Sequence, residues 1–195
     1  MNINILSQLK KPSNRDPTRI LLLVSEEVNL NEVLFLPDSL LRVFRGVLFE
    51  ISKHALKTPL YAYDKARKQY NSTLLLEHLA AVKPKGYGKC LGIFNVDIYA
   101  RGLNFVFGEA IPNGGEALIS LYRLRPEFYG DPPDEKLFRA RVVKEAVHEL
   151  GHAFGLTHCI NSECVMHFSN SIIDTDFKSI QPCLACQTKL LSRLV

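Results

Sequence analysis

The 195-residue chain has no tryptophan, two methionines and no apolar run long enough to cross a bilayer. Its longest uninterrupted apolar stretch, residues 20–24, is far shorter than the roughly 20 residues of a membrane-spanning helix. Residues 1–10 lack the charged and apolar regions of a secretory signal. We therefore expect a soluble, cytoplasmic protein without a membrane partner, folded as a single compact domain over residues 1–195.

Strong charge of one sign is also missing. The formal net charge is +4, and the few basic clusters are not interleaved with aromatic residues. Nucleic-acid-binding proteins usually carry a denser basic surface. We therefore expect no nucleic-acid partner.

The most informative pattern is a group of histidines near the C-terminus, His148, His152 and His158. Residues four apart on a helix share one face, so His148 and His152 can bind one metal ion. Glu149 is rotated by about 100° from His148, which suits holding a water beside the ion better than binding it. This is the long H-E-x-x-H-x-x-G-x-x-H pattern of zinc hydrolases.

The third histidine needs a change of chain direction. A continuing helix would carry His158 about 15 Å along the axis from His148. Gly155 lies between the second and third histidines. A glycine just past a helix end can adopt the left-handed conformation and turn the chain back. The spacing therefore predicts a helix, a glycine turn and a returning third ligand.

The metal-binding helix has its own start signal and apolar face. Residues 131–134 read Asp-Pro-Pro-Asp, which predicts an N-cap with proline at the first helical position and an acid in the first turn. An apolar stripe at helical spacing lies about a third of a turn from the histidines. It consists of Val143, Val147, Leu150 and Phe154. One face would pack on a core and the next would face a cleft.

Four of the five cysteines follow the third histidine, namely Cys159, Cys164, Cys183 and Cys186. Two close pairs of this spacing suit a tetrahedral zinc site of four thiolates. The alternative is two disulfides, which the lack of a secretory signal disfavours but which intracellular hyperthermophile proteins do contain. A zinc ion on the cysteines would also help to place the adjacent third histidine. Cys90 stands apart and is expected to be a buried, inert thiol.

The remaining chain predicts strands alternating with helices. Strands are expected at residues 19–25, 59–63, 90–99, 103–111 and 117–124, and helices at 38–54 and 72–82. A turn containing Asn113-Gly114-Gly115 joins the last two strands. The segment 103–111 is either an edge strand along the cleft, open to pairing with a substrate peptide, or an internal strand.

The residues from His148 to Cys186, with Met166 two positions beyond Cys164, resemble the signature of the archaemetzincins, a family of metzincin zinc metallopeptidases. Three upstream segments, 68–72, 102–110 and 120–124, are similar to stretches of that family, whereas residues 1–17 are not. With the predicted elements, the resemblance implies a metzincin-like α/β (α+β) fold with a mixed, mostly parallel five-stranded sheet packed with helices. Residues 1–155 would form an N-terminal subdomain ending in the active-site helix. Residues 156–195 would form a small C-terminal subdomain with the four-cysteine zinc site.

The resemblance also implies roles for individual residues. It implies a catalytic zinc on the three histidines, Glu149 as general base, and a structural zinc on the four cysteines, hence two zinc ions per chain. Met166 would be the Met-turn residue, lying under the catalytic metal without binding it. Many other metzincins have a tyrosine just after this methionine that helps to stabilise the oxyanion. No tyrosine follows Met166 here, so an oxyanion partner other than zinc has no candidate.

We therefore predict a monomeric zinc metallopeptidase acting on peptide or protein substrates, either as an aminopeptidase or as a peptidase of narrow specificity. An aminopeptidase needs an acid to hold the free α-amine, and Glu109, Glu116 and Glu127 are equivalent candidates in the sequence. The alternative is a catalytically silent, zinc-stabilised module that binds a peptide or protein. The complete ligand set and Glu149 favour the enzyme.

Overall fold

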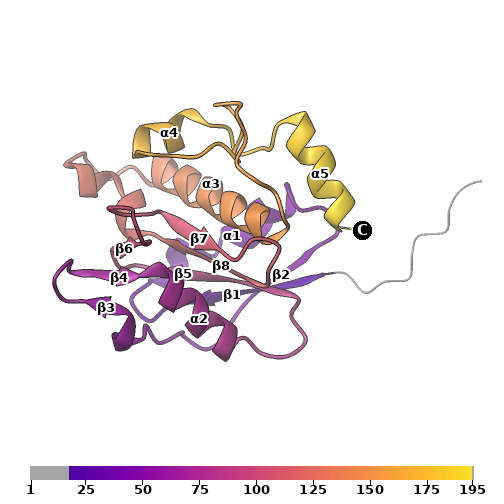
Figure 1. The fold of residues 1–195 in the computed structure, drawn as a ribbon. Helices are drawn as coiled ribbons and strands as arrows, with labels where there is room; N and C mark the ends of the chain where they lie inside the picture. Colours follow the sequence, from indigo (N-terminus) through magenta and orange to yellow (C-terminus); the bar gives the residue numbers. More distant parts are fainter. Residues whose placement is uncertain (1–17, 195) are drawn as a thin grey trace, which may run out of the picture.

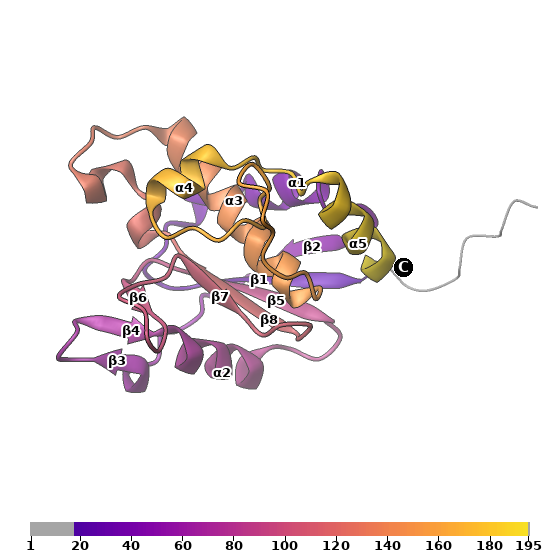
Figure 2. The same cartoon turned by 45° about the horizontal axis from the view of Figure 1, so that its top comes forward.

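The computed structural model describes residues 18–194, in which a central sheet carries helices on both faces (Figures 1 and 2). The expectation about a signal in residues 1–10 therefore concerns a segment outside the described residues. Within residues 18–194, no helix is long and apolar enough to cross a membrane.

The main sheet has five strands in the order β2-β1-β5-β8-β7. Four are parallel, namely β1 (Arg19–Val24), β2 (Leu48–Ile51), β5 (Lys89–Phe94) and β8 (Glu116–Ser120). The fifth, β7 (Gly108–Ala110), runs antiparallel to β8 at one edge. The inner strands are buried over nearly their whole length, as expected for parallel strands covered on both faces. This confirms the predicted mixed, mostly parallel five-stranded sheet.

Three short strands form a second sheet in the order β3-β4-β6. They are β3 (Tyr63–Asp64), β4 (Gln69–Asn71) and β6 (Ile98–Tyr99). The predicted strand at residues 59–63 does not join the main sheet, because residues 60–62 form a 3-10 turn that leads into β3. The fifth strand of the main sheet is instead β2.

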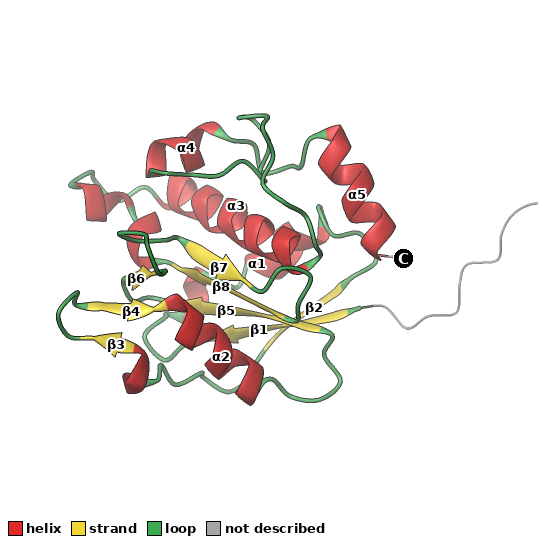
Figure 3. Cartoon of the chain, in the orientation of Figure 1, coloured by secondary structure: helices red, strands yellow, loops and turns green. Residues whose placement is uncertain are grey.

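The helices cover the two faces of the main sheet (Figure 3). α2 (Ser72–Val82) lies on one face, and α1 (Leu36–Leu41) and α3 (Glu135–Ala153) lie on the other. Alternate residues of β1 enter different cores, with Leu22 on the side of α1 and α3 and Leu23 on the side of α2. α4 (Ile172–Phe177) and α5 (Leu184–Leu194) follow on the side of α3 away from the sheet (Figure 1).

The predicted helix at residues 38–54 is wrong over most of its length. α1 ends at Leu41, and Gly46 adopts a left-handed φ of 81° before β2 begins. This conformation breaks a helix, because a continuing right-handed helix needs a negative φ throughout. Residues 47 to 51 therefore do not continue the predicted helix, and Leu48–Ile51 form β2 instead.

The other strand boundaries also differ from the prediction. The expected strand at 90–99 is interrupted between β5 and β6, and the expected strand at 103–111 shortens to β7. The strand predicted at 117–124 becomes β8 and ends at Ser120, where a 3-10 turn follows. The helix predicted at 72–82 is confirmed and is capped by the Asn71 side chain, which accepts from the backbone N–H of Leu74.

Candidate metal centre

Helix α3 carries the first two histidines and Glu149 across the top of the sheet. Asp134 caps it by accepting from the backbone N–H of Leu137 at 2.9 Å. The predicted proline at the first helical position is wrong, because both prolines precede this cap. His148 and Glu149 are buried and His152 is half-buried.

The turn at Gly155 brings back the third histidine as predicted. Gly155 has a φ of 84°, and its N–H donates to the carbonyl of His152 at 2.8 Å. The N–H of Leu156 donates to the carbonyl of Gly151 at 2.9 Å, which completes a Schellman-type helix end. As a result, the ring of His158 lies 5.4 Å from that of His148 and 4.7 Å from that of His152.

The hydrogen bonds of two histidines define which nitrogens are free. Nδ1 of His148 lies 2.8 Å from the carbonyl oxygen of Val165, and Nδ1 of His152 lies 2.8 Å from that of Leu156. A carbonyl only accepts, so each Nδ1 carries the proton and each Nε2 presents a lone pair. The two Nε2 atoms are 3.1 Å apart with no proton between them in this tautomer.

This arrangement fits a zinc ion. Ligand atoms of all three histidines lie within 4.8 Å of one another. Nitrogens about 2.0–2.1 Å from a tetrahedral zinc are about 3.3–3.4 Å apart, close to the observed separation. Burial lowers the pKa of His148 well below its usual value, and also lowers the pKa values of His152 and His158. The imidazoles are therefore neutral at pH 7, as metal binding requires.

Glu149 is buried beside the histidines and under the edge strand. Burial, followed by the nearby charge of Glu145, raises the pKa of the Glu149 carboxyl well above its usual range. Gly108 in β7 allows the close approach of this side chain, because a Cβ there would lie 2.6 Å from Glu149 Cγ. Perturbed carboxyl groups in clefts are common among catalytic acids and bases.

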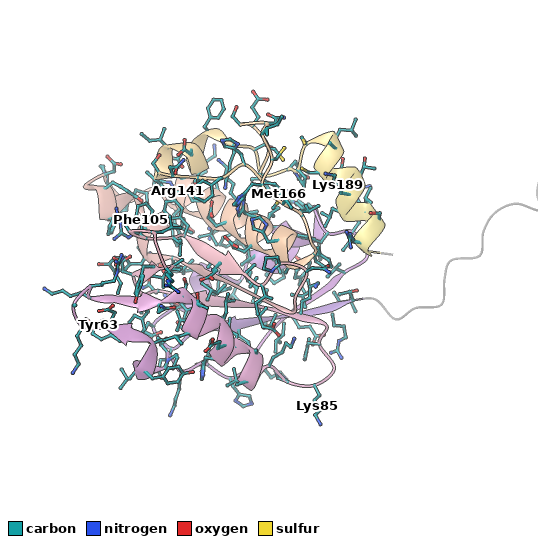
Figure 4. All side chains as sticks on the ribbon, viewed as in Figure 1. Tyr63, Lys85, Phe105, Arg141, Met166 and Lys189 are labelled. Carbon is teal, nitrogen blue, oxygen red and sulfur yellow. The ribbon has the colours of Figure 1, made fainter. Side chains whose placement is uncertain are left out.

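Met166 packs against the metal-binding helix. It is fully buried, and a Cβ on Gly151 would lie 2.5 Å from its Sδ atom. Gly151 stands between His148 and His152 in α3, so the thioether packs against the segment that carries both. Figure 4 shows Met166 between α3 and the C-terminal part of the chain.

The four cysteines form a second cluster suited to a metal. Their sulfur atoms all lie within 4.8 Å of one another, and Cys159 Sγ is 3.8 Å from Cys183 Sγ. Thiolates about 2.3 Å from a tetrahedral zinc are about 3.8 Å apart. All five cysteines are free, and a disulfide would need sulfurs about 2.05 Å apart, so the disulfide alternative is not realised.

The pKa values of the thiols in this cluster are shifted in opposite directions by backbone hydrogen bonding and by burial. The backbone N–H of Cys186 lowers the pKa of Cys183 to about 7, so that one thiolate is available near neutral pH. Burial raises the pKa values of Cys164 and Cys186. The lone Cys90, buried in β5, has its pKa raised to about 12 by burial, in keeping with an inert thiol.

A single loop joins the two clusters. The N–H of Cys159 donates to the carbonyl of Met166 at 2.9 Å, and Nδ1 of His167 lies 2.9 Å from the carbonyl oxygen of Cys159. Val165, whose carbonyl holds the ring of His148, directly follows Cys164. The cysteine cluster therefore restrains both the third histidine and the backbone that orients the first.

A cleft of about 220 Å³ opens beside the histidines. Residues 103–108 border one side, residues 168–170 border another, and α3 contributes Glu145, His148 and Glu149. β7 is an edge strand of the main sheet and meets the cleft at Gly108. Of the two positions considered for segment 103–111, the edge position is therefore correct and the internal one is not. The preceding residues 103–107 border the cleft as irregular chain rather than as a strand.

The three acids considered for amine capture do not border the cleft, although Glu109 is close enough for its charge to raise the pKa of Glu149. Glu109 accepts from the Thr73 hydroxyl, Glu116 pairs with Lys83 at 2.6 Å, and Glu127 lies in an exposed 3-10 turn. None of the three is among the residues that border this cleft.

The cleft instead contains two charged residues that sequence reasoning missed, Glu145 and Lys178. Glu145 could have been found, since it lies one helical turn before Glu149. Lys178 follows α4 and has no spacing relation to the motif, so only the fold reveals it.

Comparisons with known proteins agree with this geometry. The sequence model of peptidase family M54 matches residues 53–192. The archaemetzincin of Pyrococcus abyssi is 55% identical over 135 residues, which cover 69% of this chain and 72% of that protein. The archaemetzincin of Archaeoglobus fulgidus is 44% identical over 163 residues, 84% of this chain and 93% of that protein.

Solved structures give the same result. The crystal structure of archaemetzincin from Methanopyrus kandleri superposes with a TM-score of 0.83 at 36% identity, covering 94% of this chain and 98% of that one. That of the Archaeoglobus fulgidus protein, complexed with malonate, gives a TM-score of 0.75 at 40% identity, covering 88% and 99%. The family match, the sequence identity and the shared fold together place this chain in peptidase family M54, the archaemetzincins, as a zinc metallopeptidase that hydrolyses peptide or protein substrates.

Proposed function

We propose that each chain holds two zinc ions, a catalytic one on His148, His152 and His158 and a structural one on the four cysteines. The observation that carries this proposal is the pair of Nε2 lone pairs 3.1 Å apart, each fixed by an Nδ1 contact to a backbone carbonyl. Such second partners orient metal-binding histidines and raise their basicity. The sulfur separation of 3.8 Å supports the second ion.

Glu149 acts as the general base of peptide hydrolysis. A zinc ion held by His148, His152 and His158 would supply Lewis-acid chemistry, activating a water molecule and polarising the scissile carbonyl. Glu149 then accepts the proton of the attacking water and delivers it to the leaving amine. Its burial against β7 keeps the carboxylate away from bulk water.

Among the finer specificities, the cleft favours a peptidase of narrow specificity over an aminopeptidase. An aminopeptidase needs a free carboxylate to hold the α-amine of its substrate. Besides Glu149, the carboxylate that borders the cleft is Glu145, whose Oε1 is already 3.0 Å from Lys178 Nζ. A small cleft, below the roughly 300–1,000 Å³ usual for ligand pockets, also admits few substrate residues.

The competing function is a silent, zinc-stabilised module that binds peptides without cleaving them. Such a module has no use for a buried carboxyl beside three converging histidines, because keeping that group in place costs stability. Glu149 therefore favours turnover.

The test is cleavage of a mixed peptide library by zinc-loaded protein, with products identified by mass spectrometry and Glu149→Gln as the matched control. Cleavage by the wild type that disappears in Glu149→Gln, with zinc still bound, is the expected result. The product ends distinguish exo- from endopeptidase action. Equal products from both proteins would refute the role of Glu149, and no cleavage by fully loaded wild type would favour the silent module. Analytical ultracentrifugation of the same sample tests the proposed monomer.

A further inference from the structure

A buried ammonium group in the cleft has no part in the hydrolysis described above. The Lys178 side chain is 0% exposed, yet it borders the same cleft as His148 and Glu149. Its Nζ atom lies 3.0 Å from Glu145 Oε1, but the two are not aligned as a hydrogen bond. Within residues 18–194, this Nζ has no hydrogen-bond acceptor. An ammonium offers three donors, and buried donors without acceptors are rare in folded proteins.

The neighbouring interactions keep this group in place. Arg141 in α3 makes two hydrogen bonds of 2.7 Å to Asp176, and Lys144 donates to the carbonyls of Thr175 and Asp176. Glu145 Oε1 also accepts from the Thr175 hydroxyl at 3.0 Å. In Figure 4, Arg141 lies beside α4. Hydrogen bonds to three residues of α3 therefore hold Thr175 and Asp176, near the end of α4 and just before Lys178.

The charges of the cleft favour an anionic partner for Lys178. Glu145 and Glu149 are the carboxylates on its border, and Glu145 already occupies one side of the ammonium. With a zinc dication on neutral histidines, the positive charges of the site would outnumber the negative ones whether Glu149 is ionised or protonated. Charge-assisted hydrogen bonds from an ammonium to a carboxylate are about twice as strong as neutral ones, and more so where water is excluded.

We propose that Lys178 is a specificity-determining residue that binds a carboxylate of the substrate peptide inside the cleft. This proposal rests on the proposed peptidase function and names the chemistry of its preferred substrate. The carboxylate belongs either to an aspartate or glutamate side chain near the scissile bond or to the C-terminus of the peptide. Both sources present the same pair of oxygens to the free N–H groups of Lys178.

The experiment measures binding without turnover, by titration calorimetry on the zinc-loaded Glu149→Gln protein. One peptide series is acetylated and amidated penta-alanine with Asp, Glu, Asn or Gln at the central position. A second pair is acetylated penta-alanine with a free or an amidated C-terminus. We expect at least one carboxylate peptide to bind about tenfold more tightly than its amide counterpart. The series that shows this preference identifies the source of the carboxylate.

Variants then assign the preference to Lys178. Lys178→Met alone leaves Glu145 as an uncompensated buried charge and is expected to destabilise the fold. The informative variant is therefore Lys178→Met with Glu145→Gln, which removes both charges and keeps similar volumes. It should bind carboxylate and amide peptides within twofold of each other. The matched control, Lys83→Met with Glu116→Gln, removes a lysine–glutamate pair outside the cleft and should keep the tenfold preference.

Two results would overturn the proposal directly. One is equal binding of carboxylate and amide peptides, or no measurable binding of either, by protein that retains Lys178. The other is a preference that survives in the folded double variant. Failure of the peptidase function is distinguishable, because a carboxylate preference in binding with no library cleavage leaves the Lys178 site intact. Library cleavage without any carboxylate preference refutes the Lys178 site alone.

Discussion

Replacing Cys164 with serine tests whether the two metal clusters form one structural unit. Cys164 is buried, and its sulfur accepts from the backbone N–H of Cys183 at 3.2 Å. The next residue, Val165, orients the ring of His148 through its carbonyl oxygen. The carbonyl oxygen of Met166 accepts from the N–H of Cys159. A change at Cys164 therefore reaches the histidines through backbone that is already in contact with them.

The expected loss of zinc affinity at the histidines in Cys164→Ser is estimated in two steps. Structural zinc sites contribute about 10–16 kcal/mol of apparent binding free energy, comparable to the roughly 5–15 kcal/mol stability of a whole domain. A serine hydroxyl replaces a thiolate poorly, so the cysteine site should lose its ion and the loop its restraint. Removing a partner that orients a metal ligand typically lowers affinity by about 10–100-fold. We expect a loss of that size at the three histidines, about 1.4–2.7 kcal/mol.

The assay is competition for zinc with a chromophoric chelator, supported by cobalt substitution. Cobalt bound to thiolates has a charge-transfer band that cobalt bound to histidines lacks, so the two sites are read separately. Cys90→Ala is the control, because Cys90 lies in β5 outside the cluster and should leave both affinities unchanged. Unaltered affinity at the histidines in Cys164→Ser, with the cysteine site empty, would refute the coupling.

Three further predictions concern the same site. Gly108→Ala should lower turnover by about 100-fold or more at unchanged zinc content, because its Cβ would lie 2.6 Å from both Glu149 Cγ and the Leu118 carbonyl oxygen and would displace the Glu149 side chain. Gly88→Ala, with no atom nearer than 3.7 Å, should be neutral, and full activity in Gly108→Ala would contradict the contact. The raised pKa of Glu149 means that its ionised form destabilises the metal-free fold. This penalty is absent below about pH 4.5, where the group is protonated in both states, and it grows as the pH rises toward the folded-state pKa. Metal-free Glu149→Gln should therefore melt higher than wild type at pH 8 and equally at pH 4 by calorimetry. Zinc titrations between pH 8 and 6 should show affinity falling more steeply with acidification at the cysteines than at the histidines. The raised pKa values of Cys164 and Cys186 mean that zinc must displace protons there, whereas the lowered pKa values of the histidines leave fewer protons to displace. Equal slopes would argue against this.

The convergence of the three histidines is predictable from the sequence because its signals are local. His148 and His152 are related by one helical turn, and Gly155 fixes the turn that returns His158, so no long-range packing is needed to anticipate their convergence. Local spacing does not predict the backbone groups outside the helix that orient the histidine rings. The carbonyls of Val165 and Leu156 that orient the rings carry no sequence signature at all.

The fold is predicted less accurately where two periodicities compete. Residues 47 to 51 fit both a helical stripe and a short strand, and the left-handed Gly46 with pairing to β1 decides for the strand. Residues 103–107 have the apolar and aromatic composition of a strand but form irregular chain along the cleft. Strand pairing depends on partners distant in sequence, which a local pattern does not contain.

The contact between Lys178 and Glu145 bears on the narrow specificity proposed for this cleft. Removing both charges would give a less costly interior, because a buried ion pair often contributes less stability than well-packed apolar groups of similar volume. Here α4 is held to α3 by Arg141 and Lys144, so the fold does not depend on Lys178 for that attachment. The Lys178 ammonium has N–H donors without acceptors in a small cleft, so it would contribute more to binding a ligand than to the stability of the fold. A peptide that brings a carboxylate would supply acceptors for those donors, whereas a neutral peptide would leave them buried and unpaired. The free-energy cost of the missing hydrogen bonds would therefore exclude most peptide sequences from the cleft.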